Sequence, residues 1–163
     1  MVFGEYFPNP ALFGTGTEAE ALVSPLGAML VEALGTAILV LVIFALSDPD
    51  NAAAPDPTLV PFFVGFTVAV LISLFAPITQ AGWNPARDFG PRLVAVLAGY
   101  GTVAIPGPQG GFWIYIVGPM IGGPLGGLVY ERGLAPYLPR KVPAGSERAD
   151  AGNGRRKERM VRR

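Results

Sequence analysis

The chain has 163 residues, of which 51% are hydrophobic and 15% are Asp, Glu, Lys or Arg, and its mean hydropathy is +0.45. This composition excludes an ordinary soluble domain and favours an α-helical integral membrane protein. The formal net charge is zero. Cys and His are absent from the sequence, which excludes disulfides and thiolate chemistry and removes the usual general base and the commonest metal ligand. No cofactor is expected.

The first predicted elements are a loop and a membrane span. Residues 1–20 are punctuated by prolines and glycines, and we expect an extracellular loop there. This segment lacks a basic n-region, so no signal peptide is predicted. Residues 21–46 form the first predicted span, since crossing the hydrocarbon core takes about 20 residues. Glu32 is its one charged residue after Val23.

A polar connector at 47–57 leads to the second predicted span at about 58–75. Residues 76–83 are predicted to be a poorly helical approach, because Pro77 interrupts the pattern. A short helix follows at about 84–98. At about 1.5 Å per residue it covers only about half of a 30 Å hydrocarbon core plus some interface. We therefore expect a re-entrant half-helix.

The third predicted span, about 112–130, follows a loop at 99–111 that is rich in Gly and Pro. Its glycines include pairs four residues apart, which let helix backbones approach closely within one bundle. The membrane domain is thus placed at 21–138. Residues 139–163 are predicted to be a disordered basic tail.

Charge asymmetry sets the expected orientation. All twelve Lys and Arg residues lie at or after Arg87, and ten of them lie between Arg132 and Arg163. The positive-inside rule then places the C-terminus in the cytoplasm of a multi-pass protein of the cell membrane, in contact with membrane lipids. Nucleic acid is not an expected partner, because acidic residues dilute the basic tail and a solvated topogenic tail explains it better.

The most informative segment is Asn84-Pro85-Ala86-Arg87-Asp88-Phe89-Gly90-Pro91-Arg92. Charged residues at membrane depth are costly and therefore indicate function. Asn84 is a good N-cap, and Pro85 suits the first helical position. A helix that begins at membrane depth exposes free N–H groups and the positive end of its dipole, which is tolerable only where the backbone lines a cavity. The segment predicts a half-helix that points its N-terminus into a pore.

With its flanks, this segment resembles the second asparagine-proline-alanine motif of the aquaporin and glycerol-facilitator family. The resemblance covers roughly Tyr6 to Leu138. It implies an all-α membrane fold of two inverted repeats, each with three spanning helices and one re-entrant half-helix, of which this chain carries the second. The matching flanks are Val31-Glu32, Thr36–Leu39, Pro77–Thr79, Gly118-Pro119, Gly122-Gly123 and Tyr130.

A second such tripeptide, Asn9-Pro10-Ala11, is not expected to be the missing first motif. No apolar span precedes it, and the glycines that follow make a poor helix start. We interpret it as a coincidence within a loop.

The resemblance implies pore roles for a small set of residues. Asn84 would cap the half-helix and also donate from its amide to a solute oxygen. Arg87 would bind solute oxygens and repel protons and other cations. A salt bridge with Asp88 is its alternative, although adjacent helical residues do not face each other. The pore and selectivity residues assigned in this way are Asn84, Pro85, Ala86, Arg87, Ile72 and Ala81.

Ile72 and Ala81 occupy constriction positions at which water-selective and glycerol-selective members usually carry other residues. They look more like the nodulin-like branch, which passes small uncharged polar solutes, and simple packing is the alternative for both. Asp88 and Arg92 instead resemble glycerol facilitators. Glycerol or a related polyol is the leading solute, with urea and water as alternatives.

Glu32 and Asp88 are expected to support the pore structurally. The resemblance implies that Glu32 accepts backbone N–H groups of the pore loop, since an isolated charge within a span would be very costly. A proton relay is the alternative for Glu32, but it needs titratable partners that the sequence does not offer.

Three functions were weighed from the sequence. Passive solute conduction, as an incomplete or half channel, comes first. A membrane-embedded enzyme lacks a nucleophile–base pair or a metal-ligand cluster. A non-conducting fragment that needs a separate N-terminal half is the alternative. Two oppositely inserted copies are disfavoured by the basic tail. If a full pore forms, the resemblance implies a homotetramer.

Overall fold

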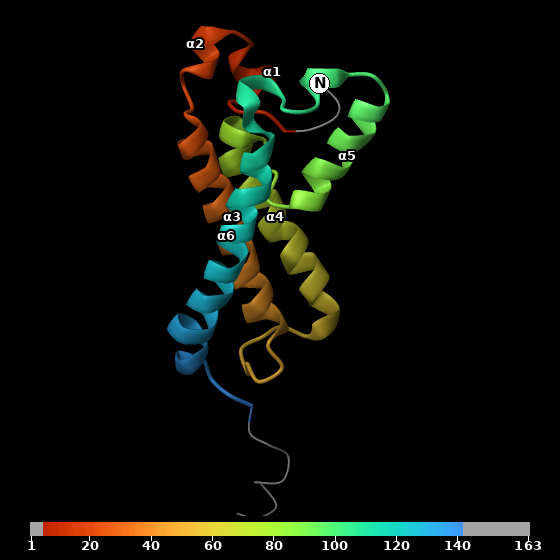
Figure 1. The fold of residues 1–163 in the computed structure, drawn as a ribbon. Helices are drawn as coiled ribbons and strands as arrows, with labels where there is room; N and C mark the ends of the chain where they lie inside the picture. Colours follow the sequence, from red (N-terminus) through yellow and green to blue (C-terminus); the bar gives the residue numbers. More distant parts are fainter. Residues whose placement is uncertain (1–4, 142–163) are drawn as a thin grey trace, which may run out of the picture.

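The computed structural model describes residues 5–141 of the chain. Within this range the protein is helical, apart from turns and an isolated antiparallel bridge between Asn51 and Arg140. Its long helices are α3 (Pro25–Ser47), α4 (Val60–Thr79) and α6 (Ile114–Val129), which run side by side along the molecule (Figure 1). Each lies in a helical stretch long and apolar enough to cross a membrane. The predicted fold class, an all-α membrane bundle of the aquaporin type, is confirmed.

Capping decides where α3 begins. The predicted span started at residue 21, but the helix begins at Pro25, because the Ser24 Oγ accepts a hydrogen bond from the Gly27 N–H at 3.1 Å. This places a good N-cap and a proline at the first helical position, where the missing N–H costs nothing.

The helix α4 is longer than predicted. The expected break at 76–83 is wrong over its first half, since α4 continues to Thr79. Pro77 sits in the last turn, where its ring removes only one N–H donor. The carbonyls of Ala76 and Pro77 accept hydrogen bonds from the Asn9 side chain and backbone, at 3.2 and 3.0 Å. The Ala76 carbonyl also accepts the Gln80 N–H, whereas the Pro77 carbonyl is a helix-end acceptor that Asn9 alone satisfies among the described residues.

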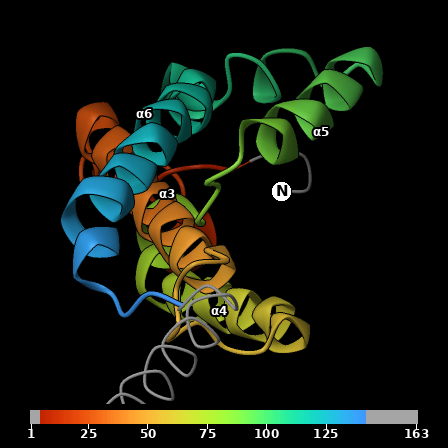
Figure 2. The same ribbon diagram turned by 90° about the horizontal axis from the view of Figure 1, so that it is seen from below.

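The short helix α5 spans Pro85–Leu97, close to the predicted 84–98. It diverges from the bundle of α3, α4 and α6 (Figure 2). The predicted loop at 99–111 contains 3-10 turns at Gly101–Val103 and Pro108–Trp113. The helix α6 then continues through a π-helical turn, Tyr130–Leu134, and a 3-10 turn, Ala135–Tyr137.

The predicted loop at 1–20 contains two short helices within its described part, α1 (Pro10–Phe13) and α2 (Thr17–Glu20). The Asn9 Oδ1 accepts from the Ala11 N–H at 3.0 Å. The tripeptide therefore does start a helix, contrary to the prediction. The helix stops after four residues at Gly14, whose φ is +76°. A single turn is too short to act as a second half-helix.

A glycine seam, made of Gly118, Gly122 and Gly126, holds α6 against α3. A Cβ added at Gly122 would collide with the carbonyl of Ala33, and one added at Gly126 would collide with the carbonyl of Ala37. The two backbones therefore lie in direct contact, and α3 packs more extensively against α6 than against α4. Small residues permit this approach in a membrane, where helices associate by close packing.

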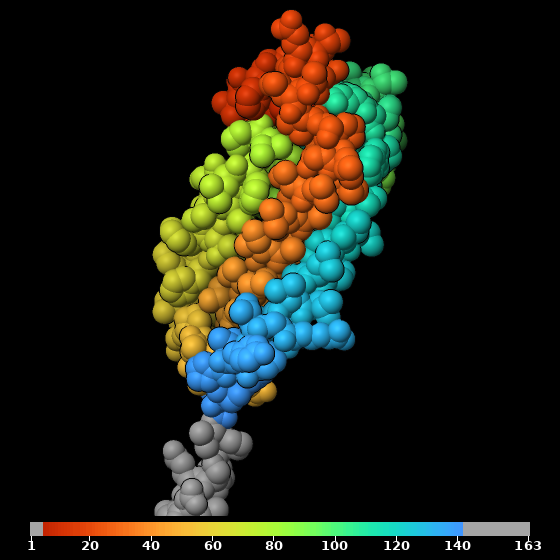
Figure 3. All heavy atoms as spheres, turned by 90° about the vertical axis from the view of Figure 1, so that its left-hand side faces the viewer, coloured from red at the N-terminus to blue at the C-terminus, as the bar shows by residue number. Residues whose placement is uncertain are grey.

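The molecule is elongated, with residues 5–24 at one end and the 47–57 connector beside the chain that follows α6 at the other (Figure 3). The Ala52 N–H donates to the Pro139 carbonyl at 2.8 Å, and the Lys141 N–H donates to the Asp50 carbonyl at 2.9 Å. The first residues of the predicted tail, 139–141, are thus paired with the connector. The rest of that tail lies outside the described residues.

Candidate functional site

The loop that enters α5 has an unusual backbone. Gln80, Ala81 and Trp83 have φ values of 61°, 62° and 45°. Residues with a Cβ rarely adopt this left-handed conformation, and they keep it only where their surroundings fix it. Such conformations cluster at functional sites, so this loop is the first structural pointer to the site.

Glu32 fixes the loop from within α3. Its carboxylate, which is fully buried, accepts the N–H groups of Gly82 and Trp83 at 3.0 and 2.6 Å. A Cβ at Gly82 would lie 2.7 Å from the Tyr115 ring and 3.1 Å from the Glu32 carboxylate. The loop is therefore held at a backbone position that leaves no room for a side chain.

The backbone N–H groups of residues 80–83 all donate within the protein, whereas two of the carbonyl oxygens of this loop accept no hydrogen bond from the described residues. The Gln80 N–H donates to the Ala76 carbonyl at 3.0 Å, and the Ala81 N–H donates to the Thr79 hydroxyl at 3.4 Å. The carbonyl oxygens of Ala81 and Gly82 accept none of the hydrogen bonds found among residues 5–141. A backbone acceptor at membrane depth needs a partner.

Asn84 caps α5 with one end of its side-chain amide. The Oδ1 accepts from the N–H groups of Ala86 and Arg87 at 3.0 and 3.3 Å. The side chain is exposed, and its Nδ2 donates no hydrogen bond within the described range. One half of the amide therefore serves the helix, and the other half faces outward as a donor.

Arg87 lies in the first turn of α5, and 51% of its side chain is exposed. It forms an ion pair with Glu5, a residue that the sequence analysis did not single out. Asp88 instead pairs with Arg92, four residues along the helix, at 2.6 Å, and both side chains are buried. Arg87 and Asp88 therefore each pair with a different residue, and the Arg87–Asp88 salt bridge considered as an alternative is not formed.

The two remaining predicted pore residues differ in exposure. Ala81 is buried in a cluster with Leu71 and Trp83, so its methyl group packs within the protein. Ile72 lies outside that cluster on α4 and is 45% exposed. The structure therefore brings Asn84, Pro85, Ala86 and Arg87 together at one helix start, with Ala81 just before them and Ile72 on a neighbouring helix.

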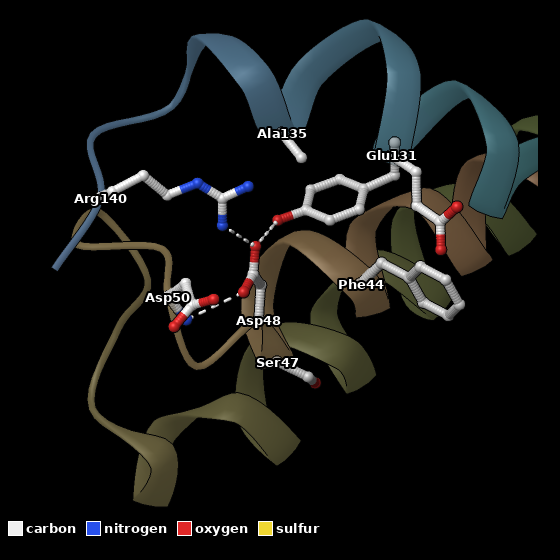
Figure 4. Close-up of a pocket in the computed structure, with 8 residues that line it drawn as sticks. Phe44, Ser47, Asp48, Asp50, Glu131, Ala135 and Arg140 are labelled. Atoms are coloured by element: carbon white, nitrogen blue, oxygen red, sulfur yellow. Dashed lines mark hydrogen bonds and ion pairs between the residues drawn. The ribbon is translucent and has the colours of Figure 1, made fainter.

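A separate polar cluster lies at the far end of the bundle. Asp48 accepts hydrogen bonds from the Tyr130 hydroxyl at 2.6 Å and from the Arg140 Nη1 at 3.0 Å. Figure 4 shows Arg140 and Asp50 pointing toward Asp48. The Tyr130 hydrogen bond, followed by that of the Asp50 N–H, holds the pKa of Asp48 below its usual range. A hollow of about 430 Å³ adjoins this cluster. It is remote from Asn84 and ties helix ends together, so we do not assign it to the pore.

Residues 6–130 match the family model described as Major intrinsic protein, and so most of the chain is covered. The chain belongs to the major intrinsic protein family. It is 40% identical over 149 residues to a glycerol uptake facilitator protein of Pseudomonas aeruginosa, covering 90% of this chain and 49% of that protein. It is 42% identical over 99 residues to Aquaporin-3 of Milnesium tardigradum, covering 60% of this chain and 30% of that protein.

Among solved structures, the aquaglyceroporin of Plasmodium falciparum aligns with a TM-score of 0.67 and 25% identity, covering 82% of this chain and 50% of that one. The chain thus spans about half or less of the length of the relatives it matches. Members of this family are passive channels rather than enzymes, which confirms the prediction that the chain is not an enzyme at the level of the family.

Proposed function

We propose that this chain forms one half of the wall of a channel for small neutral solutes. Glycerol or a related polyol is the leading solute, with urea and water as alternatives. The relatives include a glycerol uptake facilitator and an aquaporin, which supports glycerol and water within this range.

The observation that carries the proposal is the start of α5. The Asn84 Oδ1 accepts hydrogen bonds from two N–H groups of the helix, whereas its Nδ2 faces outward. The half-exposed Arg87 guanidinium adds further donors one turn along. The carbonyls of Ala81 and Gly82 add acceptors just before them. Such a row of donors and acceptors lets a neutral solute exchange its hydration for protein hydrogen bonds, while the positive charge excludes cations.

A complete pore needs an opposite wall. In this chain α5 diverges from the bundle, and apolar side chains of α4 and α5 such as Ile72 and Leu97 are exposed. We propose that a separate N-terminal half supplies that wall. A complete pore would assemble as a homotetramer in the cell membrane, with the C-terminus of this chain in the cytoplasm.

Stopped-flow light scattering on proteoliposomes tests this function. One sample contains this chain alone, and another contains this chain reconstituted with the N-terminal half of the Pseudomonas aeruginosa relative. Each is challenged with glycerol, urea and water gradients, and Arg87→Ala serves as the control variant.

We expect solute uptake above that of empty liposomes in the paired sample, and we expect Arg87→Ala to change its solute ranking. Uptake by the chain alone would mean that two copies build the pore and that the separate half is unnecessary. Solute uptake no faster than that of empty liposomes in both samples would support the non-conducting fragment instead.

A further inference from the structure

We propose that the surface between α3 and α6 binds a phospholipid whose headgroup carries both a phosphate and a primary ammonium, as phosphatidylethanolamine does. One acyl chain would lie in an apolar groove between the two helices, and the headgroup would lie in the polar hollow at their ends. The proposal concerns the end of the bundle away from Asn84, and it does not depend on solute conduction.

The groove lies between the C-terminal halves of α3 and α6 and has a volume of about 430 Å³. Most of its wall consists of residues without a polar side chain, namely Val40, Phe44, Gly123, Pro124, Gly127 and Leu128. A Cβ added at Gly123 would meet no atom closer than 4.0 Å, so this glycine leaves the groove open. Both helices lie in stretches apolar enough to cross a membrane. Hydrocarbon rather than water therefore meets this groove in a bilayer.

The groove and the polar hollow meet at Phe44 and Glu131, which line both of them. Beyond these two residues the wall of the hollow carries charged side chains, which include Asp48, Asp50 and Arg140. One surface thus passes from apolar side chains within the spans to charged side chains at their ends. A phospholipid has the same order of parts, since its acyl chains lie in the hydrocarbon and its charged headgroup lies at the interface.

Arg140 offers the contact for the phosphate. Its Nη1 donates to Asp48 at 3.0 Å, which fixes the position of the guanidinium. The side chain is 47% exposed, and its other guanidinium nitrogens donate to no residue within 5–141. The planar guanidinium matches the oxygens of a phosphate group and binds them with charge-assisted hydrogen bonds. The open donors of Arg140 therefore suit the anionic part of a headgroup.

Glu131 offers the contact for the ammonium. Its side chain is exposed, and its carboxylate forms no ion pair with any residue within 5–141. Figure 4 shows this side chain on the same side of the hollow as Phe44, with Arg140 on the opposite side. A carboxylate at the edge of a membrane is stabilised by a cation, and a primary ammonium brings three donors.

These charges distinguish between common headgroups. The quaternary ammonium of choline has no N–H to donate, so it pairs less well with Glu131 than ethanolamine does. The headgroup of phosphatidylglycerol carries no cation at all and would place its negative charge near the carboxylates of Glu131 and Asp50. We expect ethanolamine to be preferred over choline about two- to fivefold, the scale of a partly exposed ion pair.

Native mass spectrometry of the full chain in detergent measures this preference. Phosphatidylethanolamine, phosphatidylcholine and phosphatidylglycerol with identical acyl chains are titrated separately, and a dissociation constant is obtained for each. Glu131→Gln removes the charge and keeps the size of the side chain, while Glu18→Gln is the matched loss of an exposed carboxylate that lines neither hollow. Gly123→Leu fills the groove, and circular dichroism checks that this variant folds.

We expect the wild type and Glu18→Gln to bind phosphatidylethanolamine most tightly, and we expect Glu131→Gln to lose its preference over phosphatidylcholine. Gly123→Leu should weaken all three lipids by a similar factor. Equal binding of ethanolamine and choline lipids by the wild type overturns the proposal, as does a preference that survives Glu131→Gln or tighter binding of phosphatidylglycerol. Unchanged binding by a folded Gly123→Leu also overturns it, and the Glu131→Gln comparison decides alone if that variant does not fold.

Discussion

The Asn84 side chain combines two tasks that substitutions can separate. Asn84→Asp keeps an oxygen for the Ala86 and Arg87 N–H groups and adds a negative charge at a helix N-terminus, so we expect α5 to keep its stability. Asn84→Ala removes the cap and should destabilise the protein by about 1 kcal/mol. Both variants lose the Nδ2 donor, so both should reduce solute flux.

Thermal unfolding in detergent and stopped-flow flux in paired proteoliposomes check this separation. If Asn84→Asp conducts like the wild type, capping is the only task of Asn84. A large stability loss in Asn84→Asp would instead show that the outward half of the amide also supports the fold.

At this scale the sequence indicated the local contacts of the candidate site and gave no sign of the distant ones. Asn84, Pro85 and Arg87 could be recognised because caps, prolines and charges act on their immediate neighbours. Glu5 could not, because its contact with Arg87 exists only once the N-terminal segment has been gripped by Asp88 and Arg92. The left-handed backbone at Ala81 was equally hidden, since a residue with a Cβ gives no sign of it.

At the scale of helices, the seam between α3 and α6 makes a sharp prediction. Gly122→Ala would place its Cβ on the Ala33 carbonyl, and a backbone atom cannot move aside cheaply. We expect a loss of about 1–3 kcal/mol in the free energy of unfolding, as for overpacked cores. The variant is measured by chemical or thermal denaturation in detergent micelles.

Gly123→Ala is the matched control for that substitution. Its Cβ would meet its nearest neighbours, side-chain atoms of Thr36 and Val40, at 4.0 Å, an ordinary contact. Since Ala favours a helix over Gly by about 1 kcal/mol, this variant should be neutral or slightly more stable. Equal destabilisation by the two substitutions would mean that helix formation in general, rather than the seam, is responsible.

Helix positions could be read from hydropathy to within a few residues, because span length is a property of the membrane. The ends depended on partners that the sequence did not reveal. The end of α4 at Thr79 is supported by Asn9, far away in the chain, whose N–H satisfies the Pro77 carbonyl in the last turn. The four residues of α1 likewise depend on the Asn9 cap, whose side chain accepts the Ala11 N–H although glycines follow closely in the sequence.

At the scale of the whole molecule, orientation is open to a clean test because the sequence has no Cys. We expect Leu12→Cys to react with a membrane-impermeant maleimide on intact cells, since it lies in the predicted extracellular segment. Ala144→Cys, in the basic tail, should react only after permeabilisation. The opposite pattern would reverse the proposed topology, and partial labelling of both sites would indicate that the chain inserts both ways.

The seam described above also raises a question of register. Its glycines recur every four residues and meet carbonyls of α3 that recur at the same interval, at Met29, Ala33 and Ala37. A slide of α6 by one such step, about 6 Å, would therefore recreate nearly the same close contacts. Periodic packing sets how near the helices lie but leaves their axial alignment undetermined.

Contacts that occur once must supply that alignment. The Tyr130 hydroxyl reaches Asp48 at the C-terminal end of α3, and Tyr115 lies against the loop that Glu32 holds. Neither contact has a counterpart one step away on α3. The unique polar and aromatic contacts at the two ends therefore fix the axial alignment of α6 against α3, and through Tyr115 they also fix where the loop that enters α5 lies along the bundle.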